Sequence, residues 1–189
     1  MKPLRIELVD VKTPEQIELV RNMFHTPDVE RNLDHKDPLA RPGKFAGKFA
    51  QGLYQGHLWR LKETGETVGV FLLHCSRLKS RGLVELDVAV PDALHRGKGY
   101  SKDALVAVFD HWLLHDRCQA VWGWIRVDNE PSIRMVKALD IPIVRTSVWR
   151  STVREGQVES VEAAVTKDDW LRIRPRLPYL WPEGVAQPG

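Results

Sequence analysis

The chain of 189 residues is 43% hydrophobic and 28% charged, a composition that supports one sizeable core and therefore one domain. Its 28 basic and 25 acidic residues leave a net charge of +3, too balanced for the concentrated basic face of a nucleic-acid-binding protein. The two cysteines, Cys75 and Cys118, exclude a disulfide framework, and we expect free thiols in the cytoplasm. No apolar run indicates a signal peptide or a membrane span.

The first third of the chain predicts one strand followed by two helices. Apolar and polar residues alternate over residues 4–8, as they do along a strand with one buried face. Thr13 is the expected N-cap of the first helix, Pro14 suits its first turn, and Gln16 completes a capping box. A second short helix is expected near Pro27.

Residues 34–56 are rich in proline, glycine and lysine and carry three aromatic side chains, Phe45, Phe49 and Tyr54. These side chains could cover either the core or a ligand site. We favour the core, because large aromatic side chains gain most from burial away from water.

The remainder of the chain alternates strands with helices, which is typical of an α/β fold. The predicted strands cover residues 57–61, 68–78, 83–90, 121–127, 143–153 and 158–165, and the predicted helices cover residues 99–115 and 130–139. Thr166 and Asp169 form a second capping box, which predicts a short last helix that carries Trp170. We therefore expect a mixed sheet of about seven strands.

The segment between the predicted strand 83–90 and the helix that follows it has the features of a phosphate site. The start of a helix presents unpaired backbone N–H groups and the positive end of the helix dipole. Gly97 and Gly99 allow close approach of an anion, and Arg96 and Lys98 add positive charge nearby. The spacing matches neither a Walker loop nor the full dinucleotide fingerprint, so an ordinary strand-to-helix turn is the alternative interpretation.

Arg96-Gly97-Lys98-Gly99-Tyr100-Ser101 resembles the (Arg/Gln)-x-x-Gly-x-(Gly/Ala) signature of the GNAT acyltransferases, with Ser101 where glycine or alanine is usual. A second family element, an asparagine that starts a helix after the next strand, is similar to Asn129 with Ser132 three positions later. The resemblance covers about residues 4–170. It implies the GNAT fold, with a mostly antiparallel sheet, splayed central strands and flanking helices. We place the domain at residues 1–175, followed by a proline-containing tail at 176–189.

The resemblance also implies that acetyl-CoA is the acyl donor and that an amine on a protein or a small molecule is the acceptor. The diphosphate would bind the loop amides, and the pantetheine would lie between a strand edge and the start of the second helix. The implied cofactor-binding residues are Val88, Ala89, Val90, Arg96, Gly97, Lys98, Gly99, Tyr100, Ser101, Asn129 and Ser132. For Asn129, a plain N-cap is the alternative role.

Amine attack on a thioester requires a neutral amine, so a general base is expected near the acetyl group. Strand alternation places Glu85 and Asp87 on one face of their strand, and the resemblance makes Glu85 the first candidate and Asp87 the second. An ordinary solvated strand face is the alternative. Val136 stands where many family members have a tyrosine that protonates the leaving thiolate, and residues 91–96 form a longer loop than usual. These departures leave open a catalytically inactive GNAT-fold protein with a structural or protein-interaction role.

Three further patterns are interpreted as structural. His111 and His115 have a metal-ligand spacing, but the sequence offers no accompanying glutamate or third ligand, so no metal is predicted. Trp122 and Trp124 share a strand face, where packing is favoured over a substrate pocket. We expect a solvated basic face near the end of the chain, formed by Arg172, Arg174 and Arg176. The identity of the acceptor and the formation of a homodimer stay open.

Overall fold

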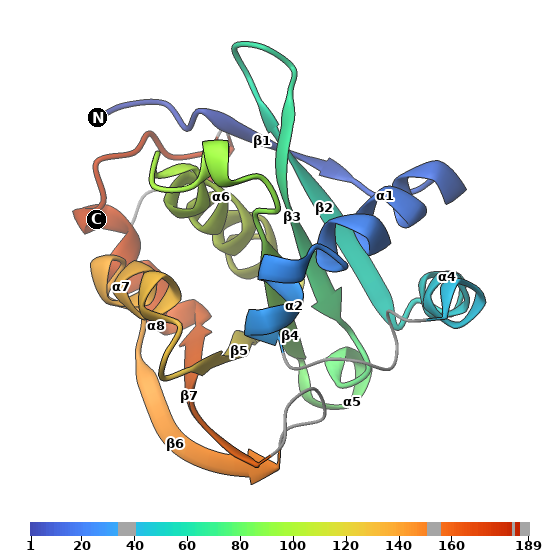
Figure 1. Cartoon of the computed structure of the whole chain (residues 1–189). Helices are drawn as coiled ribbons and strands as arrows, with labels where there is room; N and C mark the ends of the chain where they lie inside the picture. The colour runs from blue at the N-terminus through green and yellow to red at the C-terminus, as the bar shows by residue number, and fades with distance from the viewer. Residues whose placement is uncertain (34–40, 151–155, 183, 186–189) are drawn as a thin grey trace.

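Seven strands form one sheet in a computed structural model that describes residues 1–33, 41–150, 156–182 and 184–185. The sheet order is β1-β2-β3-β4-β5-β7-β6, and every neighbouring pair is antiparallel except β4 with β5, which is parallel (Figure 1). The strands are β1 (Ile6–Asp10), β2 (Tyr54–Leu61), β3 (Thr67–His74), β4 (Leu83–Ala89), β5 (Ala120–Arg126), β6 (Ile143–Arg150) and β7 (Gln157–Thr166). The predicted mixed, mostly antiparallel sheet is confirmed.

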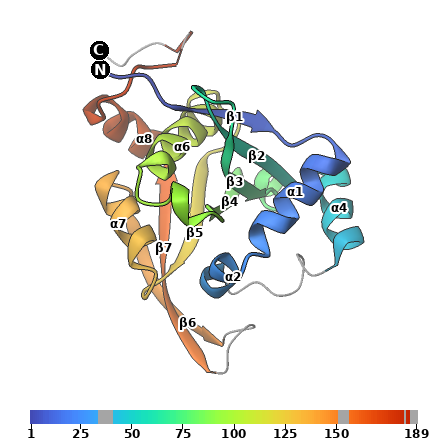
Figure 2. The same ribbon diagram turned by 45° about the horizontal axis from the view of Figure 1, so that its top comes forward.

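Helices cover both faces of the sheet, as Figure 2 shows. One face carries α1 (Pro14–Phe24), α2 (Pro27–Leu33) and α4 (Pro42–Ala50). The other face carries α6 (Tyr100–Phe109), its π-helical continuation η2 (Asp110–Leu114), α7 (Glu130–Ala138) and α8 (Lys167–Ile173). A short helix, α5 (Leu78–Arg81), joins β3 to β4. None of the helices within the described ranges is long and apolar enough to cross a membrane.

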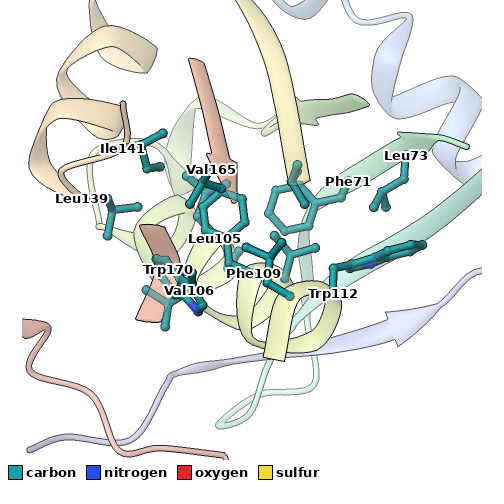
Figure 3. Packing of buried hydrophobic residues seen from close by; sticks show 14 of the residues in the cluster. Phe71, Leu73, Leu105, Val106, Phe109, Trp112, Leu139, Ile141, Val165 and Trp170 are labelled. Carbon is teal, nitrogen blue, oxygen red and sulfur yellow. The ribbon is translucent and has the colours of Figure 1, made fainter. Parts of the chain in front are cut away.

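Each face of the sheet has its own hydrophobic core. The larger core packs side chains of α6, such as Leu105 and Phe109, against Phe71 of β3 and Trp170 of α8 (Figure 3). The smaller core lies under α1, α2 and α4 and includes the buried residues Val20, Phe24, Phe45, Tyr54 and Leu72. The aromatic side chains of the segment 34–56 therefore belong to the core as expected, although Phe49 is only partly buried.

Both predicted capping boxes are present. The Gln16 amide donates to the Thr13 hydroxyl at 3.3 Å, and the Gln16 side chain accepts from the Thr13 amide at 3.0 Å. At α8, Thr166 and Asp169 exchange the same pair of bonds, each at 3.1 Å. The strand predicted over residues 68–78 ends earlier, because the chain turns into α5. Residues 34–40, and residues 151–155 of the predicted final hairpin, lie outside the described ranges.

The predicted solvated basic face is wrong for Arg174, whose side chain is fully buried. Its Nε lies 2.9 Å from Oδ1 of Asp110, and its terminal nitrogens donate to the carbonyls of Tyr179 and Leu180 at 3.1 and 2.5 Å. A buried charge requires such partners, because it has lost its hydration. Tyr179 is itself only 2% exposed, so the packed part of the chain extends beyond the boundary predicted near residue 175.

Candidate functional site

The two central strands separate halfway along their length. β4 and β5 pair at three positions, the last of which joins Glu85 to Trp122, although both strands continue beyond this point. The strands are still close at Gly123, since a Cβ atom there would lie 2.9 Å from the Leu86 carbonyl oxygen. After Glu85, β4 has no further pairing with β5 in the described residues. This second half of β4 therefore presents an open edge to the space between the two strands. This opening is the splay that the resemblance implied.

The loop after β4 leads into α6 through two residues with left-handed backbone conformation. Asp92 caps a short 3₁₀ turn, η1 (Ala93–His95), which takes up the extra length of the loop. Gly97 has a φ of 73° and Gly99 a φ of 78°, a conformation that glycine adopts without the steric penalty of a side chain. Gly99 is also the N-cap of α6. The two glycines therefore shape the backbone at the point where the helix begins.

The backbone amides of this loop divide into occupied and unoccupied donors. The Arg96 amide donates to the Ala93 carbonyl at 3.1 Å, and the Asp103 amide donates to the Gly99 carbonyl at 3.3 Å. Between them, the amides of residues 97–102 have no recorded acceptor among the residues that the structure describes. Consecutive free N–H groups beside left-handed residues at a helix start form an anion-binding concavity. The Arg96 amide, which the resemblance placed among the diphosphate donors, is therefore already occupied.

The Arg96 side chain braces the loop from within. Its guanidinium donates to the carbonyls of Val90 and Pro91 at 3.0 and 2.9 Å, and it contacts a carboxylate oxygen of Asp28 on α2 at 2.9 Å. These bonds tie the end of β4 to the loop and to α2. Lys98 has an exposed side chain beside the free amides and can add positive charge there.

Asn129 caps α7 at the end of β5, as its alternative role predicted. Its side-chain oxygen accepts from the Ser132 amide at 3.4 Å. The other side-chain atom of Asn129, the amide nitrogen, has no recorded partner within the described ranges, so the cap leaves a donor available. Val136, in the second turn of α7, is 5% exposed and packs in the larger core. Its side chain offers no acid group.

Glu85 and Asp87 project from the face of β4 that carries α1 and α4, and neither side chain stands alone. Oδ2 of Asp87 lies 2.7 Å from Nε2 of His74 on β3. Burial alone would lower the pKa of His74, but the carboxylates of Asp87 and, to a smaller extent, Glu85 outweigh it and raise that pKa above its ordinary value. The His74 ring also packs edge-on against Tyr54, with 4.7 Å between ring centroids.

Sequence reasoning missed His74, because its pairing with Asp87 depends on the register between β3 and β4. In that register His74 lies opposite Glu85, and Leu72 lies opposite Asp87. The diagonal neighbours across two antiparallel strands are close enough for such side chains to meet. The alternation pattern of β4 identified the acidic face correctly, but it held no information about the strand beside it.

One cluster, Asp10, His57 and His111, has ligand atoms within 4.8 Å of one another, which is close enough for a metal ion. The indole nitrogen of Trp112 donates to Nε2 of His57 at 3.0 Å. Because an indole N–H is only a donor, neutral His57 must carry its proton on Nδ1, which lies 3.1 Å from Asp10. A metal ion needs that same lone pair without its proton, so this set of donors does not fit a cation.

Comparison with known proteins agrees with this architecture. The family model described as "Acetyltransferase (GNAT) domain" matches residues 5–141. No curated protein matches the chain in sequence. Among solved structures, spermidine N-acetyltransferase from Vibrio cholerae in complex with CoA and spermine is similar, with a TM-score of 0.75, 8% identity, and coverage of 88% of this chain and 98% of that one.

Two further structures share the fold. An aminoglycoside acetyltransferase in complex with coenzyme A has a TM-score of 0.67, 14% identity, and coverage of 89% of this chain and 99% of that one. A ribosomal-protein-S5-alanine acetyltransferase from Vibrio fischeri has a TM-score of 0.66, 12% identity, and coverage of 87% and 93%. With the family model matching most of its length, the chain belongs to the GNAT acetyltransferase family.

Proposed function

We propose that the protein transfers an acetyl group from acetyl-CoA directly to an amine while both substrates are bound. The observation that carries this proposal is the row of amides at residues 97–102 without an acceptor in the described residues, at the start of α6 and beside the opening between β4 and β5. A diphosphate fits such donors, because its oxygens can accept several N–H bonds at once. The similar spermidine and aminoglycoside acetyltransferases were solved with CoA bound.

The remainder of the cofactor would extend from the loop into the opening. In the described residues β4 has no β5 partner at Val88 and Ala89, so those of their backbone groups that point away from β3 can pair with the amides of the pantetheine as a missing strand would. The carbonyl of Val90 already accepts from Arg96, which makes it the weaker contact. Asn129 and Ser132 would contact the pantetheine from the other side of the opening, through the side-chain donor that the cap leaves available.

In the proposed reaction, the neutral amine nitrogen attacks the thioester carbonyl carbon, a C–N bond forms and the C–S bond breaks. The nitrogen loses a proton to a base, and the leaving thiolate takes up a proton from the solvent or an acid. Glu85 is the first candidate base. Asp87 is hydrogen-bonded to His74, so it would act by orienting that ring and raising its basicity, and the neutral form of His74 becomes the second candidate base.

The test is two-substrate kinetics, followed through release of the CoA thiol. Suitable acceptors are a polyamine, an aminoglycoside and a peptide with an N-terminal alanine, the classes named by the similar structures. We expect intersecting initial-rate patterns, and parallel patterns would contradict direct transfer. Glu85→Gln should lower kcat by about 100-fold or more if Glu85 is the base, whereas Glu159→Gln, on the exposed part of β7, should leave it unchanged.

A second candidate function, a GNAT-fold protein that binds CoA without turnover, is favoured by Val136. The position where many family members place an acid holds a side chain packed in the core, and α7 therefore supplies no proton to a thiolate from there. Binding of CoA without thiol release from any acceptor class would support this candidate. Thiol release that depends on the amine and is lost in Glu85→Gln would exclude it.

A further inference from the structure

The segments at residue 2 and at residues 178–180 are bonded to each other near the proposed diphosphate loop. The Lys2 amide donates to the Pro178 carbonyl at 2.8 Å, and the Leu180 amide donates to the Lys2 carbonyl at 2.9 Å. Buried Arg174 holds this C-terminal segment from the other side through the carbonyl oxygens of Tyr179 and Leu180. Residues 177–180 are thereby fixed next to the start of β1.

A buried carboxylate on α6 joins the N-terminal segment to the C-terminal segment 177–180. Asp103 is 1% exposed, and its Oδ1 accepts from the Tyr179 hydroxyl at 2.7 Å. Its Oδ2 accepts from the Arg5 side chain at 2.7 Å and from the Arg5 amide at 3.3 Å. Burial alone would raise the pKa of Asp103, but these bonds outweigh it and lower that pKa. The Asp103 carboxylate is therefore ionised and has both oxygens occupied.

Arg5 continues from this carboxylate to the loop itself. Its Nη1 donates to the Lys98 carbonyl at 3.1 Å, and its guanidinium lies over the Tyr100 ring, 4.9 Å from the centroid. A Cβ atom on residue 99 would lie 3.2 Å from Nη2 of Arg5, so the guanidinium packs directly beside Gly99. Arg5 therefore contacts the loop on the side toward which the Lys98 carbonyl points.

Because the peptide bond is planar, the contact between Arg5 and the Lys98 carbonyl also fixes the direction of the Gly99 N–H. In a planar trans peptide, the carbonyl of one residue and the N–H of the next point in opposite directions. The bond from Arg5 to the Lys98 carbonyl therefore directs the Gly99 N–H away from Arg5, toward the face where the diphosphate would lie. The positive charge of Arg5 also offsets the negative charge of Asp103. Without that offset, Asp103 would weaken the attraction between the start of α6 and an anion.

We propose that Arg5 is a positioning residue for the CoA diphosphate: it fixes the Gly99 amide through the Lys98 carbonyl, and Asp103 with Tyr179 holds Arg5 in place. The C-terminal segment 177–180 would thus support the cofactor site indirectly, because Tyr179 helps to hold Asp103 and Arg5 in place. This inference rests on the proposed function, since it assigns a role within the same CoA site.

The test compares two acyl donors, acetyl-CoA and acetyl-pantetheine, which lacks the diphosphate. In Arg5→Met, the KM for acetyl-CoA and the Kd for CoA should rise about 10-fold, while kcat and the KM for acetyl-pantetheine stay at wild-type values. Tyr179→Phe should shift the same two constants in the same direction by a smaller factor. Arg60→Met is the control, because Arg60 has a similar exposure, 41% against 46%, and pairs with Glu7 on β1.

Each outcome distinguishes the inference from the proposed function. If the wild-type protein does not bind CoA, the proposed function fails and the inference fails with it. If the wild type binds and Arg5→Met binds equally well, the inference alone is overturned. Equal losses with both donors in a folded variant would also overturn it, because Arg5 would then not act through the diphosphate. If Arg5→Met does not fold, Arg5→Lys replaces it, because lysine keeps the positive charge but lacks the planar set of guanidinium donors. Arg5→Lys should show the same selective loss for acetyl-CoA.

Discussion

Substitution of Gly97 by alanine separates the backbone role of this glycine from any effect of bulk. A Cβ atom at residue 97 would meet nothing within 4 Å, so the change removes no contact and creates no clash. The cost arises from the φ of 73°, which an alanine adopts at a penalty of about 1 to 2 kcal/mol. If the free variant relaxes to another conformation, CoA must restore the strained one on binding. That penalty corresponds to about a 5- to 30-fold increase in Kd.

A matched control is available at Gly52, which has a φ of 67° and also no atom within 4 Å of the built Cβ. Gly52 lies in the turn before β2, away from the loop that follows β4. Because relaxation spares the free Gly97→Ala variant part of the strain, it should lose no more stability in chemical denaturation than Gly52→Ala, and calorimetry should show weaker CoA binding for Gly97→Ala alone. If Gly97→Ala binds CoA as tightly as the wild type, or if Gly52→Ala loses as much affinity, the assignment of the loop amides is refuted.

Three other predictions concern groups that the structure places in unusual surroundings. Because the pKa of His74 is raised in the folded state, its ion pair with Asp87 stabilises the fold fully below about pH 6.5 and loses that contribution as the pH rises through the folded pKa. The Tm difference between wild type and His74→Gln should therefore shrink at alkaline pH. Asp110→Asn should lower the free energy of unfolding by about 3 to 5 kcal/mol, measured in urea, because Arg174 is left buried without its counter-charge. Burial raises the pKa of the thiols of Cys75 and Cys118 to about 11 and about 12, so a thiol reagent at pH 8 should label neither until the protein unfolds.

Each of these has a clear opposing result. A Tm difference for His74→Gln that stays constant from about pH 5 to 9 would show that the ring is not charged by its neighbour. A loss below about 1 kcal/mol in Asp110→Asn would show that the buried arginine finds other partners, for which exposed Asp168→Asn provides the comparison. Labelling of a thiol in the native protein, at the rate of a free thiol, would contradict the burial of both cysteines.

The sequence predicted those parts of the fold that depend on neighbours along the chain. The capping boxes at Thr13 and Thr166 involve residues three positions apart, and both are present. The strand, loop and helix around Gly97 and Gly99 also follow from local signals, since glycine supplies the left-handed turn and the helix start supplies the free amides.

The parts that sequence reasoning missed depend on contacts between distant residues. Arg174 alternates with other arginines and therefore looks solvated, yet its partner Asp110 lies 64 positions earlier in the chain. Arg96 looks like a phosphate ligand, but its donors are used by carbonyls at the end of β4 and by Asp28, 68 positions earlier. His74 joins the candidate site through the β3–β4 register, which no local pattern reveals.

The most direct test of the account is to follow the backbone amide signals of the loop by NMR during titration with CoA. We predict that the amides of residues 97–101 show the largest shifts in the protein, that they saturate with the Kd found by calorimetry, and that the Arg96 amide, already bonded to Ala93, changes less. CoA binding that leaves the amides of 97–101 unshifted while others move would contradict the central claim.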